Sequence, residues 1–447
     1  MSALLDLLTD VLGRARDKGA TEADAFVVED QSFSAQVRMG QVDTVKHARD
    51  QHLALRVFSG RSSAAASTSD LSRESLARLV DEAVTLARIT APDPLSGLAD
   101  PAGLARSVPD LALDDPPGHA LDPEAKIELA RRYEQAALDF DPRITNSEGG
   151  DFADGHARYA YATSHGFRGE YRSSSFSLSV SPLATANGEM QRDGWYHTTR
   201  RRADLDAPEA IGRVAAQRAL RRLGARRAKT AEVPVIFDPQ MAATLIRHIA
   251  GAASGPALYR RASFLLERLG QSIAAPSITI VDDGTLSGAL GSRPFDGEGL
   301  PVRRTVLVDK GVLASYLLDT YSGRKLGLPS THHAARDGSG VGVSTTNLFL
   351  AAGDATPESL IRSVKSGLYV TELIGFGVNS VTGDYSRGAV GLWIENGELA
   401  YPVEEITVAG NLLDMFRAVE GVGNDLVFRD RTAAPTILIG RMVVAGD

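Results

Sequence analysis

The residues that could carry chemistry in this 447-residue chain are histidines, arginines, serines and carboxylates, because cysteine is absent. Its absence excludes disulfides, thiol nucleophiles and every zinc site that needs a thiolate. A histidine metal site normally places two imidazoles on one helical face, as in His-Glu-x-x-His, and that motif does not occur. His332 and His333 are adjacent, but neighbours on a strand point to opposite faces. The histidine pattern therefore predicts no metal site in this chain.

Serine and glycine give no stronger signal. The chain has no Gly-x-Ser-x-Gly elbow, and without that local cue no Ser-His-Asp triad can be selected. The glycine-rich stretch 338–342 lacks the lysine of a P-loop and the spacing of a dinucleotide fingerprint. We predict a flexible loop there.

Basic residues are concentrated between residues 200 and 229. They are Arg200, Arg201, Arg202, Arg213, Arg218, Arg221, Arg222, Arg226, Arg227 and Lys229. One interpretation is a phosphate-binding face; the interpretation we favour is a solvated helix. No aromatic residues interleave to form a platform for single-stranded nucleic acid. With a net charge of −8 and a pI near 5.7, a nucleic-acid partner is not expected.

The stretch from Gly375 to Asn411 carries the densest pattern. It predicts a strand end, a long glycine-rich loop, a hairpin turning at Asn396-Gly397, and a further edge strand. An exposed strand edge beside such a loop can accept an extended peptide. A purely structural hairpin is the alternative, and the residues alone leave both open.

Glycines in this loop permit positive φ and let another backbone come close. Asp384 and Arg387 lie three residues apart, so they either pair to fix the loop or leave Arg387 to face a substrate or partner. The candidate substrate-facing or partner-facing residues are Gly375, Gly377, Asn379, Gly383, Asp384, Arg387 and Trp393.

The elements that must position these residues form two predicted domains, 1–229 and 230–447. In the first we expect helices at 1–19, 72–87, 122–140 and 208–223, strands at 25–29, 32–39, 41–47 and 52–58, and β structure over 143–199. A long surface connection is expected at 90–123. Helices and strands occur in runs rather than in alternation, which predicts the α+β class.

The second predicted domain is mainly β. It begins with a strand at 233–237 and a helix capped by Asp238 and ending near residue 251. The further expected strands are 277–282, 303–308, 312–318, 367–374, 388–395, 398–403, 427–428 and 437–444.

Composition is typical of a globular protein, with 43% hydrophobic and 23% charged residues. No run approaches the roughly 18 apolar residues of a membrane span. The first 19 residues carry Asp6 and Asp10 within their apolar pattern, which predicts an amphipathic helix rather than a signal peptide. We therefore expect a cytoplasmic protein with no membrane partner.

Three phrases closely resemble the TldD/PmbA family, also called modulators of DNA gyrase, and within it the TldE (PmbA) branch. They are Val381 to Gly388 (Val-Thr-Gly-Asp-Tyr-Ser-Arg-Gly), Trp393 to Glu398, and Tyr401 to Asn411. Weaker matches occur at 67–72, 261–270, 291–299 and 320–327. The resemblance implies a two-domain fold, with an N-terminal helix and antiparallel-sheet domain and a mainly β C-terminal domain.

The resemblance further implies a heterodimeric zinc metalloprotease acting on unfolded, flexible or precursor peptides. The TldD branch carries a His-Glu-x-x-x-His helix, whereas here Arg247 and Ala252 stand at the two metal-histidine positions and His248 at the general-base position. Zinc needs neutral imidazole donors, which arginine cannot supply. The implied assignment is a chain with no catalytic residue and no cofactor of its own, partnered by a TldD-type subunit that holds zinc.

Two alternatives remain at this level. One is a regulatory factor that binds a nucleic-acid enzyme such as DNA gyrase through protein contacts and has no proteolytic role. The other is an independent hydrolase or homodimer with an unrecognised site, which the missing cysteine, elbow and metal motif disfavour.

Overall fold

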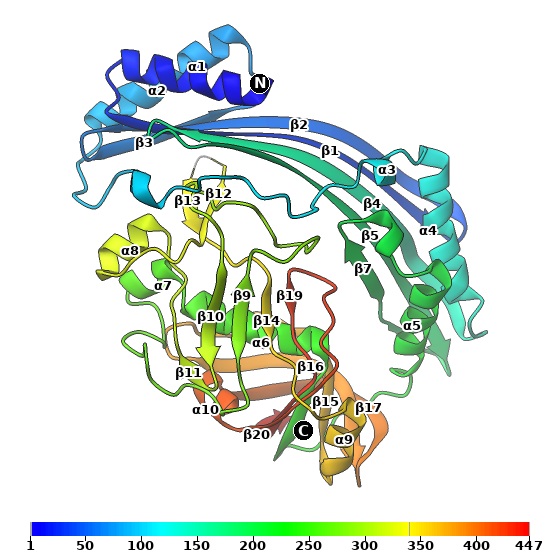
Figure 1. Ribbon diagram of the computed structural model, residues 1–447. Helices are drawn as coiled ribbons and strands as arrows, with labels where there is room; N and C mark the ends of the chain where they lie inside the picture. Colours follow the sequence, from blue (N-terminus) through cyan, green and yellow to red (C-terminus); the bar gives the residue numbers. More distant parts are fainter. Residues whose placement is uncertain (1, 339, 447) are drawn as a thin grey trace.

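The computed structural model describes residues 2–338 and 340–446. A long curved sheet built from the N-terminal half of the chain arches over a β-rich C-terminal domain (Figure 1). The predicted α+β class is confirmed, because helices and antiparallel strands are segregated rather than alternating.

The N-terminal sheet has seven strands in the order β3-β2-β1-β4-β5-β6, with β7 pairing β5. All its pairings are antiparallel. The bounds are β1 Glu22–Arg38, β2 Gln41–Ser59, β3 Ser62–Thr68, β4 Ile144–Thr163, β5 Arg168–Ala186, β6 Glu189–Arg192 and β7 Trp195–Thr199.

The four short strands predicted between residues 25 and 58 are wrong as separate elements. They form two long strands that pair from Glu22 opposite Phe58 to Arg38 opposite Gln41, with one shift of register between Gln36 and Val37. The middle of β2 is exposed and polar, so backbone pairing rather than an apolar face holds it in the sheet. The tight turn at Met39-Gly40 is confirmed, with φ of +49° and +72°.

Helices cover the two ends of this sheet (Figure 1). α1 Ala3–Asp17 and α2 Arg73–Ile89 pack at one end, and α4 Pro123–Leu138 and α5 Pro208–Leu220 at the other. The starts of α2 and α4 agree with the predicted caps, since the Ser75 amide donates to the Ser72 hydroxyl at 3.3 Å and the Ala125 amide donates to Asp122 at 2.7 Å. The connection at 90–123 contains the short helix α3 Pro116–His119.

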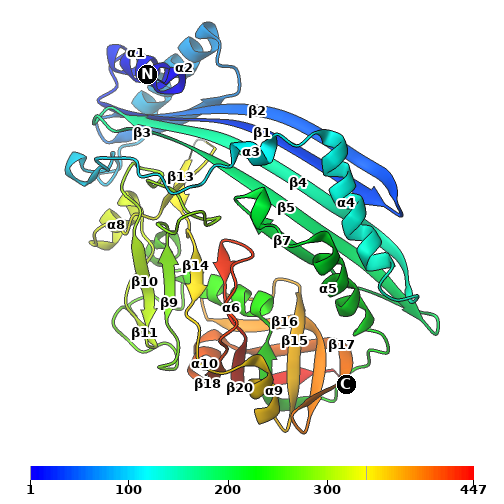
Figure 2. The same cartoon turned by 45° about the vertical axis from the view of Figure 1, so that its right-hand side comes forward.

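The C-terminal domain places helix α6 Pro239–Ala252 between two sheets (Figure 2). A six-stranded sheet has the order β17-β16-β15-β8-β20-β18, and a five-stranded sheet has the order β11-β10-β9-β14-β19. The bounds of the larger sheet are β8 Ala231–Phe237, β15 Ser366–Ile374, β16 Asp384–Glu395, β17 Glu398–Asn411, β18 Val419–Val422 and β20 Ile437–Ala445. Those of the smaller are β9 Ile280–Asp283, β10 Arg304–Asp309, β11 Val312–Leu313, β14 Leu348–Leu350 and β19 Thr432–Ala433.

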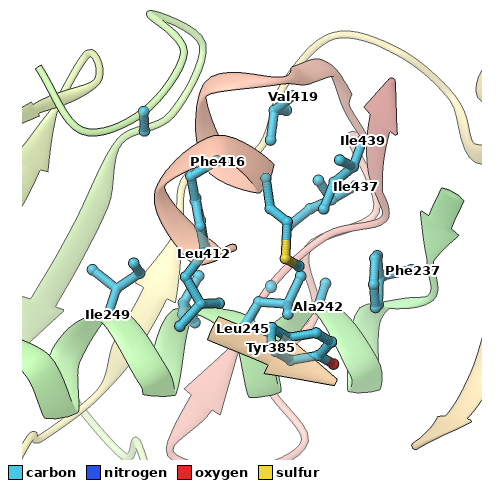
Figure 3. Packing of buried hydrophobic residues seen from close by; sticks show 14 of the residues in the cluster. Phe237, Ala242, Leu245, Ile249, Tyr385, Leu412, Phe416, Val419, Ile437 and Ile439 are labelled. Carbon is cyan, nitrogen blue, oxygen red and sulfur yellow. The ribbon is translucent and has the colours of Figure 1, made fainter. Parts of the chain in front are cut away.

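Four short helices complete the C-terminal domain, and its main core lies along α6. The helices are α7 Gly255–Tyr259, α8 Thr320–Leu326, α9 Pro357–Ser363 and α10 Leu412–Arg417. Figure 3 shows Leu245 and Ile249 of α6 beside Leu412 and Phe416 of α10. The apolar face of α6 is therefore fixed by contacts from distant parts of the chain.

Four predictions for this domain are wrong. The strand expected at 312–318 is confined to β11, Val312–Leu313. β17 is not a free edge, because its residues 407–409 also pair with β20 and close the sheet on itself. Residues 427–428 lie outside any strand. The expected flexible loop at 338–342 is largely a hairpin of β12 Ala334–Asp337 and β13 Gly340–Val343, although Ser339 itself lies outside the described residues.

No helix within residues 2–338 or 340–446 has the length and apolarity to cross a membrane.

Candidate functional site

The glycine-rich loop 375–383 folds back onto the start of β16. Gly375 and Gly383 have φ of +81° and +85°. The Ser386 amide donates to the Gly377 carbonyl at 2.7 Å, and a Cβ on Gly377 would lie only 1.8 Å from the Ser386 carbonyl oxygen. Asn379 accepts the amide of Val381 at 2.9 Å through its side-chain oxygen. These residues therefore shape the loop.

The pair between Asp384 and Arg387, one of the two alternatives, does not form. Asp384 accepts from the Thr382 hydroxyl at 2.6 Å and from the Asn411 side-chain amide at 3.2 Å, and these two bonds lower the pKa of Asp384. Residues three apart on a strand point to opposite faces, so Asp384 and Arg387 diverge.

Arg387 instead belongs to a polar cluster with His248 and Tyr385. Arg387 and Tyr385 share one face of β16, and the Tyr385 ring lies edge-on to His248 with ring centroids 6.2 Å apart. Arg387 Nη2 donates to the Leu373 carbonyl at 3.1 Å. Burial, followed by repulsion from Arg387 and Arg247, lowers the pKa of His248. These effects favour the neutral form of the imidazole.

Three buried atoms of this cluster have no hydrogen-bond partner: His248 Nε2, the Tyr385 hydroxyl and Arg387 Nε. Sequence reasoning singled out His248 and Arg387 for separate reasons, and the structure brings them together. It missed Tyr385, which sits between two selected residues, Asp384 and Arg387. Tyr385 and Arg387 could have been linked only through the alternation of side chains along β16, which places residues two apart on the same face.

The three α6 positions matched to the metal motif do not converge. Arg247 is exposed and lines a cavity of about 420 Å³ together with Trp195 and Tyr196. His248 is half-buried, and Ala252 is 1% exposed in the core. They offer a single imidazole, which does not fit a zinc ion that needs three or four ligands. No group of three or more His, Cys, Asp or Glu suited to a metal occurs in the described part of the chain.

Trp393 is buried and does not face a substrate on this chain. It is 8% exposed, belongs to the C-terminal core, and is paired across the sheet with Leu368 and Tyr401. Both faces of β16 are covered from residue 389 to residue 394. The prediction that Trp393 contacts a substrate or partner is corrected accordingly.

The loop carries an apolar surface that sequence reasoning missed. We call Ile374, Phe376 and Val381 the apolar tip; their exposed fractions are 53%, 101% and 52%. A phenylalanine between two glycines in a turn was the available signal. Contiguous exposed apolar side chains mark contact surfaces, whereas single ones are common.

The arginine-rich segment binds the two domains together, so neither earlier interpretation fits its buried members. Arg218 is buried and lies 3.1 Å from Asp193 and 3.6 Å from Asp238. Arg222 pairs with Glu372 at 2.5 Å. Arg218 and Arg222 thus meet carboxylates of β8–α6 and β15 instead of phosphate, whereas Arg213 is exposed to solvent.

Asp238 is both the cap of α6 and part of this junction. Its carboxylate accepts the amide of Met241 at 2.9 Å. Burial raises the pKa of Asp238 to about 6, against the opposing effects of Arg218 and of the Met241 hydrogen bond. The ion pair therefore compensates only part of the desolvation.

A second junction joins β1 to the C-terminal hairpin β12–β13. Asp24 of β1 lies 2.6 Å from Arg56 and 2.7 Å from Arg336, and it accepts the Tyr161 hydroxyl at 3.1 Å. Burial by itself would raise the pKa of Asp24, but Arg336 and Arg56 outweigh it, and the pKa is lowered. Nearby, burial raises the pKa of Glu298 to about 7.

Beside this junction lies a cavity of about 660 Å³, which we call the aromatic–arginine cavity. Its main lining side chains are Phe26, Tyr159, Tyr161, Tyr171, Arg200, Arg293, Phe295, Arg336 and Arg431. Sequence reasoning did not find it, because its residues come from both domains and share no motif.

Family models match the chain in three consecutive parts. The model of PmbA/TldA metallopeptidase domain 1 matches residues 23–87, the central-domain model matches residues 116–223, and the C-terminal-domain model matches residues 230–446.

Curated relatives match over nearly the full length. Metalloprotease PmbA from Escherichia coli O157:H7 is 42% identical over 425 residues, which cover 95% of this chain and 92% of the relative. The metalloprotease PmbA homolog from Haemophilus influenzae is 38% identical over 432 residues, covering 96% of this chain and 93% of the relative.

Solved structures share the same architecture. A Bacteroides thetaiotaomicron protein, described as a candidate modulator of DNA gyrase, superposes with a TM-score of 0.91 at 30% identity and covers 99% of this chain and 98% of its own. TldE from Thermococcus kodakarensis superposes with a TM-score of 0.89 at 20% identity, covering 98% of this chain and 100% of its own. The second likeness shows a common fold.

Proposed function

Because the chain belongs to the PmbA/TldD metallopeptidase family, we propose that it is the metal-free subunit of a heterodimeric zinc metalloprotease of the TldD/TldE type. The observation that carries the proposal is helix α6, where Arg247, His248 and Ala252 offer one imidazole and diverge into three environments. A TldD-type partner supplies the zinc and the general base. The cysteine-free composition suits a reducing cytoplasm.

The chemistry divides between the subunits. Zinc, when bound in the partner, polarises the peptide carbonyl and activates water. This chain contributes walls that surround an unfolded or flexible peptide. Its curved sheet arches over the C-terminal domain (Figure 2), and the cavities of about 420 and 660 Å³ fall in the size range of small-ligand sites.

The apolar tip supplies a contact for the partner. Phe376 is fully exposed at the end of a loop that glycines and Asn379 hold in place. A preformed loop loses little conformational entropy on binding, so its exposed ring can act as an anchor residue. Obligate partners bury roughly 2,000 Å² or more, so the tip is one part of a larger interface.

The proposal is tested by mixing the chain with a TldD-type partner. Sedimentation should give a stable 1:1 pair or a multiple of it, elemental analysis should place zinc in the partner, and only the mixture should cleave an unfolded casein-type substrate. Stoichiometric zinc on the isolated chain, retained until it unfolds, would contradict the assignment.

A matched pair of variants tests the apolar tip. Phe376→Ser should weaken association with the partner at least tenfold. Ile89→Ser, which removes a side chain that is 77% exposed at the end of α2, should leave association unchanged. A pair that forms but cleaves nothing would instead favour a regulatory role without proteolysis.

A further inference from the structure

The aromatic–arginine cavity has a floor made by one face of the N-terminal sheet. Phe26 of β1 is paired with Tyr161 of β4, and Tyr159 of β4 with Tyr171 of β5, so the four rings point the same way. The Tyr159 and Tyr171 rings stack with centroids 4.8 Å apart. Phe295 of the C-terminal domain meets Tyr171 edge-on at 5.5 Å. The floor is therefore lined with aromatic rings from three neighbouring strands.

A buried arginine with an unused donor lines this cavity. The Arg336 side chain is 3% exposed. Its Nε donates to the Gly297 carbonyl at 2.8 Å, and its Nη2 lies 2.7 Å from Asp24 and 3.2 Å from the Tyr161 hydroxyl. Its Nη1 is buried and has no partner. A buried guanidinium nitrogen without an acceptor is unusual, because buried polar groups are normally paired.

Arg293 adds two further unused donors, Nε and Nη2, both buried. The carboxylate near it accepts no hydrogen bond from them. Asp296 already accepts the amides of Glu298 and Leu300 at 2.9 Å each and the amide of Ala334 at 3.2 Å. The free donors of Arg293 thus remain available to a ligand.

Charge at the cavity is also unbalanced. Arg200 donates to the carbonyl oxygens of Ser174, Ala289 and Leu290, with no carboxylate among these acceptors. Arg431 lines the opening and is exposed. Among the residues lining the cavity, Asp296 is the one acidic residue against four arginines, of which Arg336 already pairs with Asp24. The cavity therefore favours an anion.

We propose that the aromatic–arginine cavity binds the terminal carboxylate of a short peptide whose last side chain is aromatic. Arginine forks match a carboxylate with two parallel hydrogen bonds, and Arg293 and Arg336 offer the unused nitrogens. The aromatic side chain lies against the Tyr159 and Tyr171 rings, where offset or edge-on contacts are favourable. That the ligand is a peptide, rather than another carboxylate, rests on the proposed function.

The experiment uses the full-length chain without a partner and measures binding by calorimetry. The probes are N-acetyl-Ala-Phe with a free carboxylate, the same peptide with an amidated end, and inorganic phosphate. The free acid should bind at least tenfold more tightly than the amide. Arg293→Gln should remove that difference, whereas Arg441→Gln, an exposed arginine paired with Glu232 on β8, should keep it.

Other results would overturn the assignment. The arginines do not recognise a carboxylate if the acid and the amide bind equally, or if the difference in their affinities is unchanged in Arg293→Gln. Phosphate that binds as tightly as the free acid and displaces it would assign the cavity to phosphate. The Arg293→Gln variant leaves the Asp24 junction intact. If this variant nevertheless unfolds, the proposal stands only if Tyr171→Leu weakens binding of the free-acid peptide at least threefold.

This test is independent of the partnership with a TldD-type subunit. A complex that assembles and cleaves while the chain binds neither peptide would refute the cavity alone. A chain that binds the free acid but forms no complex would refute the heterodimer and leave the proposed binding of a peptide carboxylate in the cavity intact.

Discussion

Asp24 and Asp238 are both buried where the two domains meet, and each lies beside two arginines, yet their pKa values move in opposite directions. Asp24 has guanidinium nitrogens at 2.6 and 2.7 Å. Arg218, the nearest guanidinium to Asp238, is at 3.6 Å, and the negative charge of Asp193 opposes ionisation of Asp238 further. The ion pairs outweigh burial at Asp24, where the charged atoms are in direct contact, and offset only part of it at Asp238.

The difference separates a junction whose ion pairs outweigh the cost of burial from one whose ion pair does not. The Asp24 junction fixes the hairpin β12–β13 beneath the curved sheet and holds Arg336 at the aromatic–arginine cavity. The Asp238 junction lies at the start of α6, the helix that carries Arg247 and His248. We expect the first to dominate stability and the second to respond to pH.

The largest effect is expected from Asp24→Asn. Removing this charge leaves Arg56 and Arg336 buried without their main acceptor, and breaking a buried pair costs about 3–5 kcal/mol. Urea unfolding at pH 7.5 measures the loss, with Asp43→Asn on the exposed part of β2 as the control. Since the folded pKa of Asp24 is lowered, its contribution is present above pH about 4 and disappears as the pH falls further. A loss at pH 7.5 no greater than that of Asp43→Asn would remove the distinction between the junctions.

A smaller loss is expected from Arg218→Met. The substitution removes the ion pairs to Asp193 and Asp238 and should cost about 2–3 kcal/mol at pH 7.5, below the direct-contact case because one of the two pairs is long. The cost should shrink at pH 5, because Asp238 then takes up a proton. Arg213→Met, an exposed arginine of the same helix α5, is the control. An equal loss of stability at both pH values would contradict the interpretation that protonation of Asp238 weakens its pair with Arg218.

Asp238→Asn should change stability in the opposite direction. The folded pKa of Asp238 is raised to about 6 from 3.8. The ionised carboxylate therefore destabilises the folded state, and this effect is largest above pH 6. Its unfavourable contribution fades as the pH falls toward 4. Asparagine keeps the helix cap and removes the charge, so unfolding should become harder by about 1 kcal/mol at pH 7.5 and be unchanged at pH 4. Paired urea titrations at the two pH values measure this, and a destabilised variant at pH 7.5 would show that Arg218 compensates fully.

The smallest stability effect is expected from Arg387→Gln, because its guanidinium makes one carbonyl hydrogen bond and no carboxylate pair. The loss should stay near 1 kcal/mol or below. The pKa of His248 should rise when this nearby cation is removed, and should rise less in Arg247→Gln, whose charge acts more weakly on His248. Histidine NMR titrations compare the two variants. If the pKa of His248 changes in neither variant, the histidine does not interact electrostatically with these arginines.

Local signals were predictable from sequence. The caps Ser72, Asp122 and Asp238 start helices as expected, and Asn396-Gly397 turns its hairpin with φ of +52° and +82°. Each depends on backbone groups within a few residues. The α+β class followed from the order of such segments.

Long-range pairing was not predictable in the same way. The polar middle of β2 has no apolar alternation, so only its neighbour β1 makes it a strand. Trp393 looked like a surface residue in a hairpin but is a core residue of the central strand between β15 and β17. For the candidate site, the positive-φ glycines and Asn379 could be chosen in advance, whereas the Asp384–Arg387 pair could not be excluded without the strand register.

By itself, the sequence determined the caps, the turns, the class of the fold and the residue types at the α6 positions, because these depend on short-range chemistry and on composition. Only the tertiary structure decided which charges meet. It paired Asp24 with Arg336 across 312 positions of the chain, and brought His248 to Arg387 and Phe26 to the rings of β4. Interaction between charges depends on separation in space and on burial, and a linear sequence records neither.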